Sequence, residues 1–256
     1  MLALHALLPM ALLAVGAWLA SLIKNDVSIA DSLWPLFILL AAASYAIAAP
    51  QTGPRAAVVV SLVVIWAFRL AAHITWRSWG EPEDRRYKAM RARNEPYFRW
   101  KSLGLVFGLQ ATLAWVVSLS ALAAVIDSRP WNWMATVGLC VFVFGAVFEA
   151  VADWQLARFK ADPAHRGQVM DRGLWRNSRH PNYFGEFCVW WGIYLIALST
   201  PAWWAIASPV LMTVLLLKVS GVALLEHDIT ERRPGYREYI ARTNAFFPGP
   251  TRQPQS

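Results

Sequence analysis

The segment from Asp171 to Glu186 carries the densest set of residues that could bind a phosphate-bearing ligand. Pro181 suits the first turn of a helix, because no amide donor is needed there, and Ser178 could serve as the cap. The exposed backbone amides at such a helix start attract anions. The basic side chains that would contact a pyrophosphate at this point are Arg176, Arg179 and His180.

Two pairs of residues four positions apart could extend this anion site. Asn182 and Glu186 would share one face of the helix that follows Pro181, and this face could meet a ribose or an amide group. Glu149 and Asp153 form the second pair, at the end of an apolar run. They could hold ligand hydroxyls or pair with arginines of neighbouring loops. The alternative for the whole region is structural: a basic turn that anchors a helix end to lipid.

A second group of polar residues lies in the N-terminal half of the sequence. Asp31 opens an apolar run, where it could cap a helix or polarise a substrate carbonyl and relay a proton. Arg69, His73 and Arg77 recur every fourth residue beside Trp66, which predicts a polar stripe along one helix. Arg69 is the deepest of the three, and we expect it to face a wet cavity.

The sequence lacks the spacings of common metal and nucleotide motifs. It contains no HExxH motif, no paired CxxC motif and no histidine cluster, so no metal site is expected. Cys140 and Cys188 fall within apolar runs and are expected to pack there. The absence of GxGxxG and P-loop patterns excludes a soluble-type nucleotide fold.

The elements that must position these residues are membrane spans. The chain has 256 residues, of which 57% are hydrophobic and 16% charged, so it cannot bury its apolar surface in one small aqueous core. A helix that crosses a bilayer needs about 17 to 25 apolar residues. Seven runs approach that length: Leu2 to Ile23, Leu33 to Ala49, Ala56 to Trp76, Leu105 to Ile126, Trp131 to Ala152, Phe187 to Ser199 and Ala202 to Leu225.

Lysine and arginine are concentrated in alternate loops between these runs. The ranges 77–101 and 153–179 and the tail after Glu226 hold nearly all of them, whereas the opposite loops hold only Arg55 and Arg129. The positive-inside rule then predicts an all-α polytopic protein with about seven spans, an extracytoplasmic N-terminus and a cytoplasmic C-terminus. A net charge of +8 fits this topology and anionic lipid, so membrane lipids rather than nucleic acid are the expected partners.

Three stretches resemble the C-terminal domain of the steroid 5-alpha-reductase superfamily, and in particular its largely uncharacterised bacterial branch. They are the range 149–186, the segment GLWRNSRHPNYFGE within it, and the tail string RRPGYREY. The N-terminal half agrees through Asp31 and Trp34, Trp66 and Arg69, and the string EDRRY at 83–87. The resemblance implies a single membrane domain in the bacterial inner membrane. Residues 1–130 would form its lipid- and substrate-facing half, and residues 131–256 its cofactor-binding half.

The same resemblance implies NADPH-dependent reduction of a carbon–carbon double bond in a lipid-like enone. It places Asp153, Asn182 and Glu186 at positions that hold the dinucleotide, Lys160 at a basic position, and Tyr236 at an aromatic position of the tail. The full set expected to bind NADPH is Glu149, Asp153, Lys160, Arg176, Arg179, His180, Asn182, Tyr183, Glu186, His227, Arg232, Arg233 and Tyr236.

The sequence departs from the family pattern at residues that would contact the substrate. Glu149 replaces an asparagine, and the glutamate and tyrosine that bind a steroid ketone correspond to Asp31 and Trp66. An indole N–H can donate a hydrogen bond but cannot deliver a proton as a phenol can. We therefore expect Tyr87 to supply the missing hydroxyl. The expected catalytic residues are Asp31, Trp66 and Tyr87, and a steroid, fatty acyl or prenyl substrate all remain compatible.

The RHPNY segment also resembles the membrane methyltransferases that act on isoprenylcysteine or phospholipid headgroups. In those enzymes similar residues hold S-adenosylmethionine, and paired glutamates usually follow the last span. Here Glu226 is followed by His227. Methyl transfer is therefore the alternative activity, and a polar layer that only sets the topology is the third hypothesis.

Overall fold

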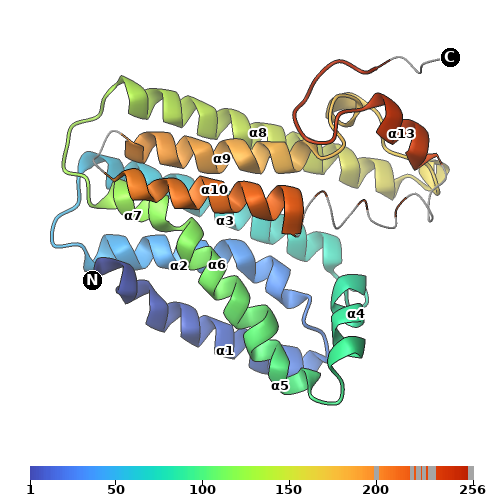
Figure 1. The fold of residues 1–256 in the computed structure, drawn as a ribbon, viewed down its shortest axis with the longest axis horizontal. Helices are drawn as coiled ribbons and strands as arrows, with labels where there is room; N and C mark the ends of the chain where they lie inside the picture. Colours follow the sequence, from blue (N-terminus) through green and yellow to red (C-terminus); the bar gives the residue numbers. More distant parts are fainter. Residues whose placement is uncertain (199–201, 220–221, 223–225, 227–228, 230–234, 253–256) are drawn as a thin grey trace. The chain divides into compact units, whose positions relative to one another are not determined.

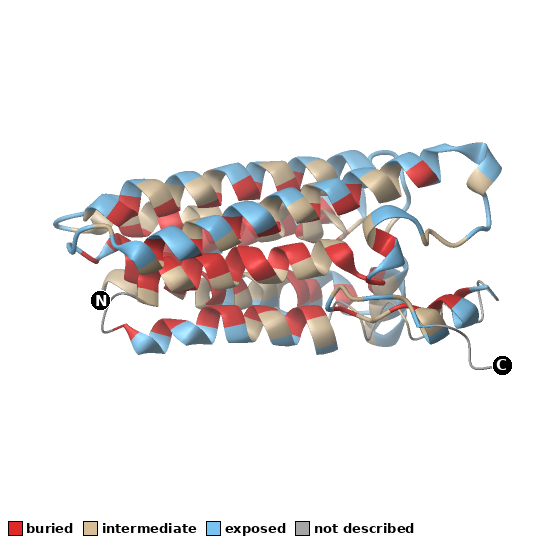
Figure 2. Ribbon diagram, turned by 90° about the horizontal axis from the view of Figure 1, so that it is seen from above, coloured by how far each residue is buried: buried red, intermediate tan, exposed pale blue. Residues whose placement is uncertain are grey.

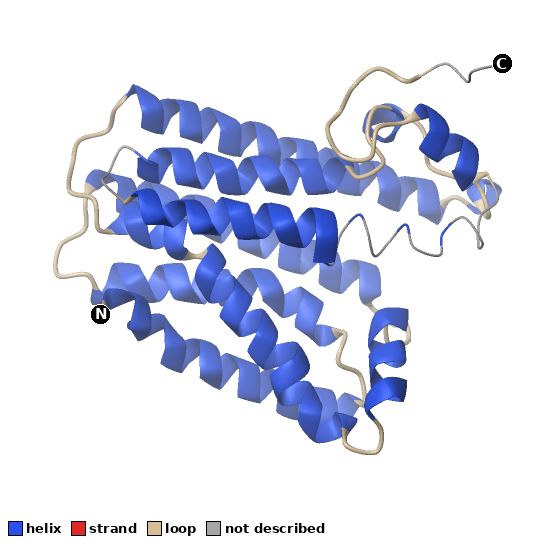
Figure 3. Ribbon diagram, viewed as in Figure 1, coloured by secondary structure: helices blue, strands red, loops and turns tan. Residues whose placement is uncertain are grey.

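A computed structural model describes residues 1–198, 202–219, 222, 226, 229 and 235–252. No residue within these ranges lies in a β-strand, and helices account for most of the chain (Figure 3). The chain forms two compact units. Unit 1 comprises Met1–Asn132 and Ala197–Ser208, and unit 2 comprises Trp133–Ile196 and Pro209–Ser256.

Unit 1 begins with three long helices, which Figure 1 labels α1 to α3, and continues through a series of shorter helical segments that include one π-helical segment. In chain order these are α1 (Leu7–Lys24), α2 (Ile29–Ala48), α3 (Pro54–Ser78), α4 (Arg85–Asn94), α5 (Phe98–Ser102), the π-helical segment Leu103–Gly108, α6 (Leu109–Val117) and α7 (Leu119–Val125).

Unit 2 contains two long helices that lie side by side, α8 (Trp133–Ala161) and α9 (Pro181–Leu198) (Figure 1). The loop that joins them includes the 3-10 turns Pro163–His165 and Gly173–Arg176. The remaining described helices are α10 (Ala207–Val214), which starts at the boundary between the units, its π-helical continuation Leu215–Val219, and α13 (Tyr236–Arg242).

Several described helices are long and apolar enough to cross a membrane. They expose large aliphatic side chains: Leu8 in α1 is 70% exposed and Ile65 in α3 is 63% exposed. Figure 2 shows buried and exposed positions alternating along the long helices, as expected where one face packs and the other meets lipid. The chain is thus a multi-pass membrane protein. Within the described ranges five helices are candidate spans by length and composition: Leu2–Lys24, Ile29–Ala48, Pro54–Ser78, Phe98–Val125 and Trp133–Ala161.

The expected seven spans are not all of this length. The segment Trp203–Val219 is a shorter apolar helix, and α9 has 18 residues but carries Asn182 and Glu186 in its first turns. The orientation and the total of seven stay predictions. The expected end of the fifth span at Ala152 is a boundary of hydrophobicity only, because α8 continues to Ala161. No proline or glycine interrupts the chain until Pro163, so the helix persists after the apolar run has ended.

Two pairs of glycines bring the backbones of α8 and α9 into direct contact. A Cβ atom on Gly138 would lie 2.7 Å from the carbonyl oxygen of Gly192, and one on Gly145 would lie 2.6 Å from that of Gly185. The glycines are seven residues apart in each helix, so each pair falls on one helical face. Small residues at such an interface allow membrane helices to approach closely. This contact fixes the register of α8 against α9.

A buried ion pair lies at the start of α3 in unit 1. The Arg55 guanidinium pairs with the carboxylate of Asp127 and donates to the carbonyl oxygen of Pro130 at 2.8 Å. The side chains of Arg55 and Asp127 are 1% and 4% exposed. Arg129 also bonds Asp127, at 3.3 Å, but is half exposed. Arg55 and Arg129, the two arginines of the opposite loops, therefore share one carboxylate, which neutralises one of their two charges.

Candidate functional site

The glycine contact brings together polar side chains that the sequence predicted to bind a cofactor. Asn182 Nδ2 on α9 donates to Asp153 Oδ1 on α8 over 3.2 Å. A Cβ atom on Gly185 would lie 2.6 Å from the Cβ of Glu149. The predicted pairs along each helix, Glu149 with Asp153 and Asn182 with Glu186, thus belong to one α8–α9 cluster. Because Gly185 has no side chain, the α8 backbone approaches it closely.

The carboxylates of this cluster are withdrawn from solvent. Glu149 is 2%, Asp153 6% and Glu186 8% exposed. Ionised carboxylates accept hydrogen bonds only, and buried ones need donors to remain stable. Hydroxyl and amide N–H groups of a ligand would supply such donors. Within the described ranges no group of three or more His, Cys, Asp or Glu residues could hold a metal ion.

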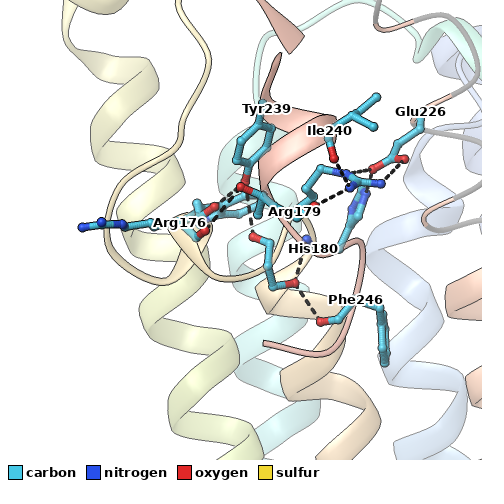
Figure 4. Close-up of polar contacts among 10 residues, drawn as sticks. Arg176, Arg179, His180, Glu226, Tyr239, Ile240 and Phe246 are labelled. Carbon is cyan, nitrogen blue, oxygen red and sulfur yellow. Dashed lines mark hydrogen bonds and ion pairs between the residues drawn. The ribbon is translucent and has the colours of Figure 1, made fainter. Parts of the chain in front are cut away.

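The helix start predicted at Pro181 is confirmed. Ser178 Oγ accepts from the backbone N–H of His180 at 3.1 Å and donates to the carbonyl oxygen of Phe246 at 2.8 Å (Figure 4). The His180 ring stacks on Tyr183, one helical turn further, with centroids 5.5 Å apart and planes 6° apart. The prediction that Ser178 caps the helix is wrong, because its hydroxyl accepts from the amide of His180, which precedes α9. Ser178 instead fixes the chain entering α9 and ties it to the C-terminal segment.

In this structure the Arg179 guanidinium bonds other groups of the protein (Figure 4). Its Nε and one terminal nitrogen bond the two carboxylate oxygens of Glu226 at 2.7 and 2.8 Å. The other terminal nitrogen donates to the carbonyl oxygens of Thr243 and Ile240 at 2.6 and 3.3 Å. Every guanidinium nitrogen is thus engaged, and Arg179 links the start of α9 to α13 and Glu226.

The Glu226 carboxylate is hydrogen-bonded to His180 as well as to Arg179. His180 Nε2 lies 2.9 Å from Glu226 Oε1. Burial by itself would raise the pKa of Glu226, but the hydrogen bonds from His180 and Arg179 and the charge of both groups outweigh it and lower the pKa to about 2. The sequence showed Glu226 as the first of several acids after the last apolar run, and nothing in its spacing indicated these partners.

This depressed pKa predicts a specific acid sensitivity. A carboxylate whose pKa is lower in the folded state stabilises the protein above its unfolded pKa, near 4.5, and loses that contribution as the pH falls towards 2. The difference corresponds to about 3 kcal/mol at most. We expect the unfolding free energy of the wild type to exceed that of Glu226→Gln at pH 7 and the gap to close between pH 4.5 and 2, measured in detergent by circular dichroism. A gap that is constant with pH would contradict the pairing.

Three of the remaining predicted cofactor residues, Lys160, Arg176 and Tyr236, are described in unit 2. Lys160 and Arg176 are exposed, and Arg176 accepts a hydrogen bond from Thr243 at its carbonyl oxygen. Tyr236 is buried, with its ring edge-on to Tyr239 at 5.3 Å. The three other residues expected in this set, His227, Arg232 and Arg233, lie outside the described residues.

Tyr239 attaches the C-terminal tail to the loop before α9, a role that the sequence did not indicate. Its hydroxyl donates to the carbonyl oxygens of Trp175 and Ser178 (Figure 4). Burial, with the nearby Tyr236 adding to it, raises the pKa of Tyr239, so the phenol stays protonated and keeps donating. Tyr239 and Arg179 together hold α13 against the loop that precedes α9.

Unit 1 holds a second polar cluster, centred on Asp31. Arg86 donates to Asp31 Oδ2 at 2.6 Å, and the Tyr87 hydroxyl donates to Asp31 Oδ1 at 2.6 Å. The alternative role of Asp31 as the N-cap is wrong, because Ser28 is the N-cap residue of α2 and Asp31 lies in its first turn. The helix starts earlier than the apolar run, so the carboxylate points at α4 instead of at backbone amides. Asp31 and Tyr87, which were both expected to be catalytic, are therefore directly hydrogen-bonded.

Two hydrogen bonds attach the segment that carries Tyr87 to the α1–α2 loop. Glu83 accepts from the backbone N–H of Val27 at 3.0 Å, and Ser28 Oγ accepts from the backbone N–H of Asp84 at 2.8 Å.

Burial raises the pKa of Tyr87, and the charge of Asp31 and the hydrogen bond to Asp31 raise this pKa further. The phenol is therefore protonated, which is the state that can donate a proton or hydrogen bond. Trp66, the other residue expected here, is 1% exposed within α3.

Gln110 joins this cluster and was not predicted. Its Nε2 donates to the Tyr87 hydroxyl oxygen at 3.2 Å, so α2, α4 and α6 meet at the phenol. A signal existed in the sequence, because Gln110 is the only amide side chain of the fourth apolar run. A polar group at such a position is costly unless it is bonded or functional.

A family model for proteins of unknown function, DUF1295, matches residues 17–243. The chain belongs to the DUF1295 family. This family is related to steroid 5-alpha-reductase-like proteins, which agrees with the resemblance carried by the RHPNY segment and the Asp31–Tyr87 residues. The matched range includes both clusters described above.

Among curated proteins, an uncharacterised protein from Schizosaccharomyces pombe is 26% identical to this chain over 268 residues. The alignment covers 90% of this chain and 75% of the yeast protein. No solved structure gives a significant match to the chain.

Proposed function

We propose that this DUF1295 protein is a membrane-embedded reductase that uses NADPH to reduce a carbon–carbon double bond in a lipid-like substrate. The observation that carries the proposal is the α8–α9 cluster, in which Asn182 bonds Asp153 and the carboxylates of Glu149 and Glu186 are buried nearby. Such a set accepts and donates hydrogen bonds without a metal ion. The basic loops favour a cytoplasmic membrane with this cluster on the cytoplasmic side.

The donor and acceptor chemistry of unit 2 fits a dinucleotide. Carboxylates of Asp153 and Glu186 suit ribose hydroxyls and a carboxamide N–H₂, and the Asn182 amide can both donate and accept. Lys160 and Arg176 are exposed basic residues suited to phosphate groups. Arg179 and His180 are bonded to Glu226, so in this proposal they support the site by holding the tail in place. When bound, the cofactor supplies the hydride.

In this proposal unit 1 supplies the proton that the reduction needs in addition to the hydride. Tyr87 keeps its proton because of burial and the charge of Asp31, and Arg86 neutralises the carboxylate that holds the phenol. The pair can therefore polarise the polar end of the lipid, and the phenol can donate a proton while Asp31 directs it. Apolar surroundings exclude water, which strengthens these contacts.

A binding experiment tests the cofactor assignment. Purified protein in detergent should bind NADPH, observed as energy transfer from tryptophan to the reduced nicotinamide, and Asp153→Asn should weaken binding about tenfold because one charged acceptor is lost. Asp162→Asn is the matched control. Asp162 is an exposed acid of the same unit that caps the Pro163–His165 turn, and we expect no change in NADPH affinity there. Wild-type protein that shows no energy transfer would remove the basis of the proposal.

One observation favours methyl transfer as the second candidate. The RHPNY segment and Glu226 are joined through Arg179 and His180, so an acid after the last apolar run contacts the segment that resembles the S-adenosylmethionine site of membrane methyltransferases. Saturable binding of S-adenosylmethionine that is weakened by Glu186→Gln, together with no binding of NADPH, would favour this activity over reduction.

A further inference from the structure

Gln110 has an unusual environment for a side chain inside an apolar span. It lies in α6, directly after the π-helical segment Leu103–Gly108. Such segments insert a residue into an α-helix and occur frequently at functional sites. The insertion changes which face the following residues present, and here Gln110 points at Tyr87.

The two ends of the Gln110 amide are used differently. Nε2 donates to the Tyr87 hydroxyl oxygen, and the phenol in turn commits its proton to Asp31, so the direction of both hydrogen bonds is set by the carboxylate. The amide oxygen Oε1 is buried and accepts no hydrogen bond from any group within the described ranges. A buried acceptor without a donor is unfavourable, because it has lost its hydrogen bonds to water and gained none in return. A ligand that brings a donor to Oε1 would recover this free energy.

Oε1 itself is buried, but side chains of the same cluster are partly exposed. The side chains of Asp31 and Arg86 are 24% and 34% exposed, and Gln110 itself is half-buried. A ligand can approach past the carboxylate and the guanidinium. A ketone or ether oxygen brings no donor to Oε1, whereas a hydroxyl does.

We propose that the Asp31–Tyr87–Gln110 cluster binds the hydroxyl group of a lipid alcohol, which donates its hydrogen bond to Gln110 Oε1. The proposal rests on the proposed reductase function only in naming this alcohol as the substrate class, since the binding itself needs no cofactor. Gln110 is then the residue that distinguishes an alcohol from a ketone or an ether with the same skeleton. The hydroxyl could belong to a sterol or to a polyprenol.

The test compares probes that differ only in the polar end. The full chain in detergent, without NADPH, is mixed with cholesterol, cholesteryl methyl ether or cholest-4-en-3-one, and separately with geranylgeraniol or its methyl ether. Native mass spectrometry measures the bound fraction. We expect the alcohol to bind about tenfold or more tightly than the ether or ketone of its series, because only the alcohol satisfies Oε1. The series that binds identifies the skeleton.

Variants at Gln110 separate recognition from folding. Gln110→Leu removes the acceptor and should abolish the preference, whereas Gln110→Glu retains an acceptor oxygen and should preserve it. Thr112→Val is the matched control on the same helix. Thr112 is exposed and its hydroxyl donates to the Gly108 carbonyl oxygen, so the preference should be unchanged. If Gln110→Leu does not fold, Gln110→Met takes its place.

Two outcomes would overturn the proposal. One is equal binding of alcohol and ether by the wild type in both series, and the other is a preference that persists in folded Gln110→Leu or Gln110→Met. Failure of the reductase assignment gives a different pattern, in which the alcohol preference is present but energy transfer to NADPH is absent.

Discussion

Gly145→Leu is expected to disrupt unit 2 and to abolish NADPH binding. Even a Cβ atom at this position would lie 2.6 Å from the Gly185 carbonyl oxygen and 2.7 Å from the Val189 nitrogen. Both are backbone atoms that cannot rotate away, so α8 and α9 must separate. Because Asp153 and Asn182 bond each other across this interface, the separation also disperses the proposed cofactor residues.

The smaller change Gly145→Ala permits a quantitative comparison. We expect it to lower the unfolding free energy by about 2 to 3 kcal/mol, as for overpacking of a close interface. Gly16→Ala in α1 is the matched control, since nothing lies within 4 Å of a Cβ added there. Removing a helical glycine should leave stability unchanged or slightly higher at Gly16. Denaturation with sodium dodecyl sulfate in mixed micelles measures both, and equal effects would refute the glycine contact.

The buried ion pair of unit 1 carries the second large effect. Arg55→Met leaves the Asp127 carboxylate buried with only the half-exposed Arg129 as a charged partner, and Asp127→Asn leaves the Arg55 guanidinium uncompensated. Breaking a buried pair from either side costs about 3 to 5 kcal/mol. We expect each single variant to lose that much in unfolding free energy, measured by the same denaturation in mixed micelles.

The double variant and a surface control test whether the effect belongs to the pair. Arg55→Met combined with Asp127→Asn should lose much less than the sum of the single losses, because no unpaired charge remains. Arg129→Gln should cost less than about 1 kcal/mol, since an exposed partner contributes little. Additive single losses would mean that Arg55 and Asp127 act independently and that their proximity is incidental.

Composition and the length of the apolar runs indicated a membrane protein, because a long hydrophobic run forms a helix in a bilayer whatever its neighbours. The helix start at Pro181 followed from local chemistry in the same way: proline and Ser178 act within one turn. The extension of α8 to Ala161 shows the limit of such reasoning, since hydrophobicity ended at Ala152 while helical propensity did not.

The partners of individual side chains depended on tertiary structure. Periodicity assigned Glu149 and Asp153 to one helical face, but the register of α8 on α9 decided that Asp153 would meet Asn182, and this register comes from backbone contact at glycines. Sequence suggested a phosphate ligand for Arg179, and the fold surrounds its guanidinium with Glu226 and two carbonyl oxygens from distant positions in the chain.

The residue types alone therefore determined a multi-pass membrane protein with acidic, amide and basic groups near helix ends. Which of these groups touch was decided only by helix packing, because hydrogen bonds are short and directional, so a shift of one residue in register exchanges every partner. The π-helical segment before Gln110 is such a shift within a single helix. This segment places the Gln110 amide, which was not predicted, against the Tyr87 hydroxyl, which was predicted.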